Sequence, residues 1–341
     1  MAYTDIDKST EYFNTKLYTG NGSTQSITGV GFQPDWVWTK ERSGVCDHHI
    51  FDVLRGATYK INSASTESSS ADANTLTSFD SDGFSVGTNA CQNNNTDTYV
   101  SWNWKANGSG SSNTDGSITS TVSASTTSGF SIVTYTGTGA NATIGHGLGV
   151  TPSAVFYKSL STGNWFVYHK SIPATKHIVL NSTNAEATSS TIFNDTAPTS
   201  SLLTIGNYSE INGSGNSHIA YCFAEKKGFS KFMSWSGSGS TDGTFLYTGF
   251  KPAFFMYKVT SGAGSWGMLD NKRDTFNPVD NTLYAHDSSA EASDHDVDFC
   301  SNGLKIRSAG GDINASGSSY IGMAFAEAPL VSSNGVPAVA R

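Results

Sequence analysis

The sequence predicts an all-β protein made of three tandem β-sandwich repeat domains of the jelly-roll or lectin-like kind. Three observations support this fold class: the composition, a threefold internal repeat, and short apolar runs separated by turn residues. Of the 341 residues, 35 are glycine and only 14% are charged, which is too few charged side chains for the polar faces of long exposed helices. Because 12% of the residues are aromatic, a disordered chain is excluded.

The internal repeat is the strongest signal in the chain. Each copy opens with an aromatic residue, a hydroxyl residue and a Gly-x-Gly step, at 18–22, 135–139 and 235–239. A proline, an apolar run and a lysine follow, and an alternating segment closes the copy. The distance from the proline to the closing segment is 65, 66 and 68 residues, counted from Pro34 to Tyr99, from Pro152 to His218 and from Pro252 to Tyr320. Chance does not keep three spacings so close, so these are tandem units, each able to hold a modest core.

The closing segment of the first copy has the alternation of a β-strand. Val100, Trp102 and Trp104 face one side of it, and polar or phenolic side chains face the other. We therefore expect Trp102 and Trp104, with Trp36 and Trp38 from the apolar run, to form the aromatic core of the first domain. A glutamate after a Ser/Asn-rich turn recurs in every copy and indicates a structural turn role: Glu67, Glu186 and Glu291.

We expect domain boundaries near residues 108 and 228. The first domain, 1–108, combines an N-terminal anchor segment with the first repeat. The second and third domains cover 117–228 and 229–341, the last with an extended C-terminal tail. Between the first two lies a Gly/Ser/Asn-rich linker at 107–117. The segment 1–15 has no counterpart in the other copies, and we expect it to attach the protein to a larger particle.

The charge and the hydropathy of the chain argue against nucleic acid and membranes as partners. The net charge is −8, and the 20 basic residues are scattered, so we expect no nucleic-acid binding. No apolar run is long enough for membrane insertion, and the N-terminus lacks the pattern of a signal peptide. Four cysteines, at Cys46, Cys91, Cys222 and Cys300, form no metal-binding or paired framework, and we expect free thiols made in a reducing cytoplasm. No cofactor is expected.

One hairpin carries the candidate ligand-binding residues. Trp165 and His169 are four residues apart in a strand-like run, so they share a face and could stack on a sugar ring. The alternative is that both build the core of the second repeat, as aromatic residues usually do.

Three carboxylates provide the candidate metal site. Asp294, Asp296 and Asp298 alternate along one strand face, where their oxygens could bind Ca²⁺. The alternative is a solvated acidic face. No nucleophile elbow, HExxH motif, phosphate-binding loop or paired glycosidase acids occur, so we expect that the protein is not an enzyme.

The segments 31–40, 51–56, 76–84, 129–137 and 165–170 together resemble a module of tail-fibre and other virion proteins of tailed bacteriophages, many of them marine. The resemblance covers most of residues 9–328. It departs in the third copy, at Met256 and at Asp270-Asn271-Lys272-Arg273. The resemblance implies a structural virion protein, a tail fibre, spike or capsid-surface fibre for host attachment. Such a protein is made in the host cytoplasm, binds other virion proteins and leaves by lysis.

Two other functions stay open, a lectin-like carbohydrate-binding module that binds a host-surface glycan and a polysaccharide depolymerase. The depolymerase would need a clustered acid pair that the sequence does not offer. We also expect a homo-oligomer, with a trimer favoured, because few charges are available to protect open sheet edges.

Overall fold

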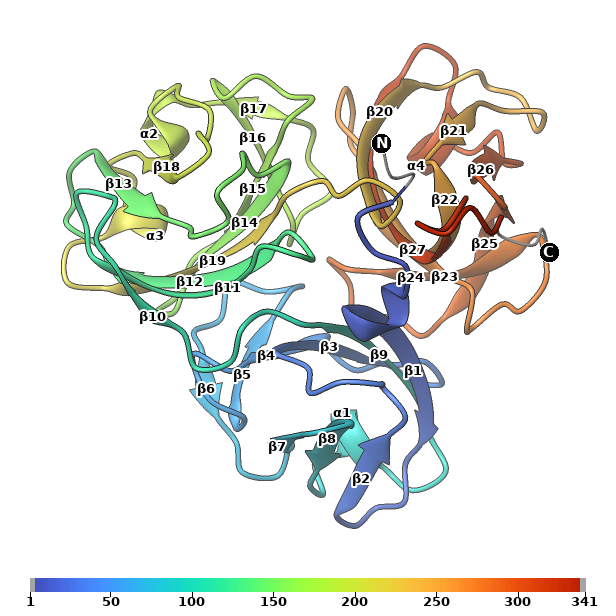
Figure 1. Cartoon of the computed structure of the whole chain (residues 1–341), viewed down its shortest axis with the longest axis horizontal. Helices are drawn as coiled ribbons and strands as arrows, with labels where there is room; N and C mark the ends of the chain where they lie inside the picture. The colour runs from blue at the N-terminus through green and yellow to red at the C-terminus, as the bar shows by residue number, and fades with distance from the viewer. Residues whose placement is uncertain (1–3, 338–341) are drawn as a thin grey trace.

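The strands gather in three lobes around a common centre (Figure 1). The computed structural model describes residues 4–337 and is nearly all β, with 45% strand and 6% helix, as the sequence predicts. Strands of lobe 1 come from residues 13–104, those of lobe 2 from 111–223 and those of lobe 3 from 230–329. The chain therefore passes between lobes close to residues 108 and 228.

Lobe 1 contains a large antiparallel sheet and a smaller one. The large sheet has the order β1 (Phe13–Thr19), β9 (Thr98–Trp104), β3 (Trp36–Glu41), β4 (His49–Asp52), β5 (Tyr59–Asn62) and β6 (Ser70–Ala71). The smaller sheet has the order β2 (Gln25–Thr28), β8 (Gly83–Val86) and β7 (Leu76–Asp80). A 3-10 turn, η1 (Ser9–Glu11), precedes β1, and a short helix, α1 (Ala90–Asn93), precedes β9.

Lobe 2 repeats this plan with two added strands. Its large sheet has the order β10 (Ser111–Asn113), β11 (Ser120–Ser125), β12 (Phe130–Thr136), β19 (Ser217–Phe223), β14 (Ala154–Ser159), β15 (Trp165–His169), β16 (Lys176–Val179) and β17 (Ala187–Thr188). A two-stranded sheet joins β13 (Ala142–Gly145) to β18 (Leu202–Ile205), and the helices are α2 (Ser190–Phe193) and α3 (Ser209–Asn212). Since β10 pairs with β11, the expected linker 107–117 is partly a strand of lobe 2.

Lobe 3 joins all its strands in one sheet. The order is β20 (Ser230–Ser236), β27 (Ser319–Pro329), β22 (Phe250–Val259), β23 (Trp266–Asp270), β24 (Val279–Tyr284), β25 (Ala292–Cys300), β26 (Gly303–Ile306) and β21 (Phe245–Tyr247). The helix α4 (Gly311–Asn314) precedes β27. Six strands, β1-β9-β3-β4-β5-β6, thus recur in the same order as β12-β19-β14-β15-β16-β17 and β20-β27-β22-β23-β24-β25. The matching registers let residues be compared from lobe to lobe.

The largest hydrophobic core belongs to all three lobes. Trp36, Trp38, Trp102 and Trp104 are buried in it, together with aromatic residues of lobes 2 and 3. The four tryptophans are buried as expected, and Trp102 and Trp104 share a face, but the core that they help to form is common to all three lobes and is not that of the first domain alone. The separate core of lobe 1 is smaller and contains no tryptophan among its described members: Ile27, Val37, Phe51, Leu76, Phe84 and Val86.

Three equivalent residues meet at the centre of this shared core. Trp104, Phe223 and Phe325 hold the same register position in β9, β19 and β27, because they pair with the equivalent residues Trp36, Ala154 and Phe254. Their ring centroids are 6.2 Å apart from Trp104 to Phe223, 5.9 Å from Phe223 to Phe325 and 5.5 Å from Trp104 to Phe325. The lobes are therefore held together by a continuous aromatic cluster rather than linked as independent beads.

The N-terminal segment is part of the folded body. The backbone N–H of Asp5 donates to the carbonyl of Lys227 at 3.1 Å, and Ile6 is buried in the shared core. From Phe13 onward the chain forms β1, the counterpart of β12 and β20, so the expectation that 1–15 has no counterpart is wrong there. The C-terminal tail lies beside this segment, since Ser333 N–H donates to Asp7 Oδ1 at 2.7 Å. Residues 1–3 and 338–341 lie outside the described range, and attachment to a particle through this end stays a prediction.

A disulfide joins Cys46 to Cys91, which corrects the expectation of four free thiols. Cys46 lies in the loop after β3, and Cys91 lies in α1, 45 residues further along the chain. No spacing motif signals this pairing, because it depends on the fold bringing that loop against that helix. Cys222, which is buried, and Cys300, which is half-buried, are free thiols as expected.

The repeated opening glycine is explained by a close backbone approach. A Cβ atom at Gly20, Gly137 or Gly237 would lie 2.0, 2.3 or 2.1 Å from a carbonyl oxygen just after α1, α3 or α4. The last residue of each helix is a buried asparagine. Its side-chain Oδ1 accepts from the backbone N–H of the residue after the glycine at 2.8–2.9 Å, and the pairs are Asn93 with Asn21, Asn212 with Thr138, and Asn314 with Ser238. The motif therefore fastens the end of β1, β12 or β20 to the helix that precedes the last strand of the same lobe.

Gly237→Ala should lower the free energy of unfolding by about 1–3 kcal/mol, because the added methyl group forces the backbone apart. Gly262→Ala is the control in the same lobe, since no heavy atom lies within 4 Å of its Cβ position. Thermal unfolding of both variants measures the difference. Equal melting temperatures would contradict the close approach.

Trp102→Ala should destabilise all three lobes together, by about 3–5 kcal/mol, because it opens a cavity in the shared core. Urea unfolding followed by tryptophan fluorescence and by far-UV circular dichroism should show one coincident transition at lower urea. Val45→Ala, at a side chain 75% exposed, is the control. A first transition confined to lobe 1 would show that the lobes unfold independently.

Unfolded, unreduced protein prepared under oxidising conditions should contain two titratable thiols, and reduction should raise this number to four. Replacing Cys46 and Cys91 by serine should cost about 2–4 kcal/mol, because the cross-link restricts the unfolded chain. Cys300→Ser is the matched control. Four thiols before reduction would contradict the pairing.

Candidate functional site

The lobes are joined by a closed ring of backbone hydrogen bonds. At each junction an N–H from one lobe donates to a carbonyl of the next at 2.9 Å: Ser69 to Leu160, Glu186 to Thr260, and Glu291 to Arg42. These bonds run from lobe 1 to lobe 2, from lobe 2 to lobe 3 and from lobe 3 back to lobe 1. They also show that Ser69, not Glu67, is the structural counterpart of Glu186 and Glu291.

Trp165 and His169, the candidate sugar-stacking residues, lie inside the molecule. Trp165 is fully buried in the shared core, and its Nε1 donates to the carbonyl of Asn62 in lobe 1 at 2.8 Å. His169 is 4% exposed and lies beside Phe232 of lobe 3. They share a strand face as predicted, but the interpretation as core residues is the one that the burial supports. A sugar ring cannot reach either side chain.

Buried ion pairs occupy two of the three junctions. Asp52 Oδ2 and Arg55 Nε are 2.6 Å apart, and Tyr221 of lobe 2 donates its hydroxyl to the same carboxylate at 2.7 Å. Asp270 and Arg273 form the same pair at 2.6 Å, with Trp102 Nε1 of lobe 1 donating to Asp270 at 3.1 Å.

The third junction has His169 at the position of these aspartates, because Ala154 pairs with His169 as Trp36 pairs with Asp52. Burial lowers the pKa of His169 to about 4, which keeps its ring neutral at pH 7. The expected departure of the third copy at Asp270 to Arg273 is therefore wrong, since lobe 3 keeps the pair of lobe 1 and lobe 2 departs.

The lysine that ends each apolar run is buried: Lys40, Lys158 and Lys258. Each ammonium group donates to a backbone carbonyl, for example Lys258 Nζ to Val259 at 2.6 Å and Lys158 Nζ to Gly163 at 2.8 Å. Burial lowers the pKa of all three to about 8. These lysines hold the turns at the junctions.

The stability of the protein should rise as the pH increases from about 7 to about 9. In that range the unfolded state binds more protons than the folded state, because the folded lysine pKa values lie near 8 and the unfolded values near 10.5. Above about pH 9 the trend should reverse, because burial raises the pKa of Cys222 and of Tyr99 to about 12 and also raises the pKa of eight other tyrosines, so the unfolded state releases protons there that the folded state keeps. Urea unfolding across this range measures the profile. Lys258→Met should reduce the rise and Lys8→Met, at an exposed position, should not; equal slopes would contradict the assignment.

The candidate calcium ligands do not converge. Asp294, Asp296 and Asp298 share the outer face of β25, as predicted. Asp298 pairs with Arg307 Nε at 2.6 Å, and Asp294 accepts from the hydroxyl of Tyr284. Within residues 4–337, no group of three or more His, Cys, Asp or Glu side chains is placed to hold a metal ion. The solvated acidic face is the interpretation that the geometry supports.

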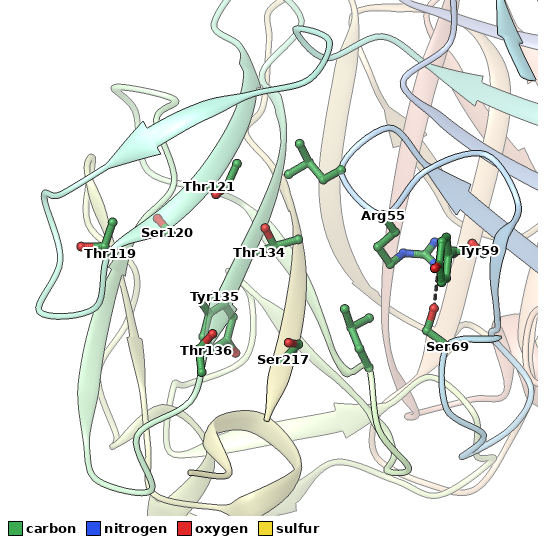
Figure 2. A pocket seen from close by; sticks show the side chains of 12 residues that line it. Arg55, Tyr59, Ser69, Thr119, Ser120, Thr121, Thr134, Tyr135, Thr136 and Ser217 are labelled. Carbon is green, nitrogen blue, oxygen red and sulfur yellow. Dashed lines mark hydrogen bonds between the residues drawn. The ribbon is translucent and has the colours of Figure 1, made fainter. Parts of the chain in front are cut away.

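A groove of about 490 Å³ between lobes 1 and 2 is the candidate functional site. Figure 2 shows Thr119, Thr121, Thr134 and Thr136 on the lobe 2 side, and Arg55, Tyr59 and Ser69 across from them on lobe 1. The other lining residues are Leu54, Ser120, Tyr135, Leu160 and Ser217. Most of the wall therefore carries hydroxyl groups, which can donate and accept hydrogen bonds. Sequence reasoning did not find this site, because its two walls are far apart in the chain.

The lobe 1 wall combines a cation with an exposed ring. Arg55 is held by Asp52 through Nε, and its NH1 donates to the Tyr59 carbonyl at 2.7 Å and to Ser69 Oγ at 3.2 Å. The Tyr59 side chain is 46% exposed. Such a wall offers a flat apolar face beside a fixed guanidinium group.

The equivalent groove between lobes 2 and 3 has a volume of about 410 Å³. Its lining includes Glu186, the counterpart of Ser69. Lys176, the counterpart of Tyr59, forms an ion pair with Glu186 at 2.5 Å. In this groove Lys176 and Glu186 therefore neutralise each other. The groove of lobes 1 and 2 has the exposed ring of Tyr59 and the hydroxyl of Ser69 at the same two positions.

A protein-family model described as a domain of unknown function, DUF7483, matches residues 8–329. The chain belongs to this family. The match extends over all three lobes, so the family unit is the whole three-lobed body with its shared core. A comparison with curated proteins found no match. In the described residues, no helix has the length and apolar composition needed to cross a membrane.

Proposed function

We propose that this DUF7483 protein is a structural component of the virion of a tailed bacteriophage. In this proposal it is a tail fibre, spike or capsid-surface fibre that takes part in attachment to the host surface. The resemblance of its repeats to tail-fibre modules supports the virion role. The observation that carries the attachment role is the closed three-lobed body, because its shared core holds surface grooves in fixed positions.

The proposal treats the lobes as three tandem β-sandwich repeats of one unit. The support is that six strands recur in the same order and that each lobe has its own core beside the shared one. The equivalent glycine and asparagine contacts in every lobe also support a common origin of the three units.

Assembly into a homo-oligomer, with a trimer favoured, and docking on other virion proteins belong to the same proposal. One sheet edge offers support, since β21 carries the exposed aromatic residues Phe245 and Tyr247, at 43% and 60%. Exposed aromatic edges are typical of contact surfaces. Sedimentation of the full chain tests this part; a monomer at every concentration would contradict self-assembly.

A binding role without enzymatic activity is favoured over a depolymerase. The hydroxyl-lined groove supports a lectin-like carbohydrate-binding function, which is the alternative to a purely structural role. Incubation of host surface polysaccharide with the protein should leave its chain length unchanged. Release of shorter products would contradict the proposal.

Electron cryo-microscopy of the particle, with the protein labelled by a specific antibody, is the main test. We expect label on the outside of the tail or capsid. We also expect added purified protein to slow the adsorption of the phage to its host, because both compete for one receptor. Particles without label would contradict the virion role.

A further inference from the structure

The three lobe junctions can be compared at one position. Glu291 accepts from Arg42 NH2 at 2.7 Å and from Arg273 NH1 at 2.9 Å. Glu186 occupies the same place at the next junction and pairs with Lys176 at 2.5 Å. At the junction of lobes 1 and 2 the corresponding residue is Ser69. Of the three residues whose backbone N–H donates across a junction, Ser69 is therefore the one without a carboxylate.

The junction of lobes 1 and 2 keeps the arginine although it lacks the glutamate. Arg55 is the counterpart of Arg273, and both are fixed by an aspartate three residues earlier at 2.6 Å. In lobe 3 the NH1 group of Arg273 donates to Glu291 at 2.9 Å. The NH1 group of Arg55 donates instead to the Tyr59 carbonyl at 2.7 Å and to the Ser69 hydroxyl at 3.2 Å, so that a neutral oxygen stands where lobe 3 has the carboxylate. The Arg55 side chain is only 3% exposed, so a ligand would meet its NH1 group at the floor of the groove, beside Ser69, at the point where its equivalent binds a carboxylate.

Tyr59 also lines this groove. Its counterparts are Lys176 in lobe 2 and Asn281 in lobe 3, so an aromatic ring stands only here among the three positions. Figure 2 shows Tyr59 next to Arg55 and Ser69, on the opposite side of the groove from the threonines. A partly exposed ring offers a flat apolar face for the C–H groups of a sugar, and threonine hydroxyls can bond its hydroxyl groups.

We propose that this groove binds a carboxylated sugar, such as a uronic acid residue of a surface polysaccharide. The carboxylate replaces Ser69 Oγ as the acceptor of one Arg55 NH1 hydrogen and accepts a second hydrogen bond from the Ser69 hydroxyl, in the place that Glu291 occupies in lobe 3. The sugar ring lies on Tyr59, and its hydroxyl groups bond Thr121 and Thr134. This inference rests on the proposed attachment function and names the ligand class of that site.

Titration calorimetry with an oligosaccharide of glucuronic acid, and with its carboxyl-reduced glucose counterpart, tests the proposal on the full chain. We expect the acidic oligosaccharide to bind at least tenfold more tightly. Ser69→Glu should abolish this binding, because it restores the internal carboxylate that the other two junctions carry and so is compatible with the fold. Ser68→Glu, at an exposed neighbour, is the charge-matched control and should bind normally.

Tyr59→Ala should weaken binding at least tenfold, while Tyr247→Ala in lobe 3 should leave it unchanged. Equal affinity for the acidic and neutral oligosaccharides would overturn the carboxylate assignment, and so would normal binding by Ser69→Glu. No binding of either sugar would overturn the site. Labelling of the particle is independent of these results, so failure here and failure of the virion role can be told apart.

Discussion

At the centre of the molecule, aromatic rings from three separate stretches of chain pack against one another, and the position of every other part depends on this contact. Trp104, Phe223 and Phe325 contribute one ring from each lobe. Each buried ring stabilises the fold by about 1.5–3 kcal/mol relative to exposure, and it does so only while the lobes stay together. The ring of backbone hydrogen bonds then fixes the angle at which the lobes meet.

Because the three lobes share one strand order, residues at equivalent positions can be compared between them. The asparagine and glycine contacts recur in all three lobes, as expected for parts that the fold itself requires. The differences lie at the junctions, where a neutral His169 replaces a buried aspartate and Ser69 replaces a glutamate. The same six-strand order recurs in all three lobes despite these exchanges, which therefore change the chemistry of the junctions and not the plan of the lobes. The groove of lobes 1 and 2 is where such an exchange reaches the surface.

Rigidity and binding are connected in this molecule. Arg55 is held by Asp52, which also accepts from Tyr221 of lobe 2, so the groove wall is fixed from both sides. A guanidinium group that is already ordered loses little entropy when a ligand carboxylate replaces a hydroxyl partner. The same junctions also contain the buried lysines, which connect the stability of the body to pH.

The sequence by itself determined the all-β class, the threefold repeat and the shared face of Trp102 and Trp104, because these follow from local alternation and from spacing along the chain. It also placed Asp294, Asp296 and Asp298 on one face of a strand. Only the tertiary structure decided what those faces meet. Alternation indicates that a face is buried but not which partner covers it. It therefore does not distinguish a core within one domain from a core shared by three, or a sugar from a core residue as the neighbour of Trp165. The Cys46–Cys91 pair, the equivalence of Ser69 with Glu186, and the groove beside Arg55 all join residues from distant segments, and such contacts exist only once the three lobes close around their common core.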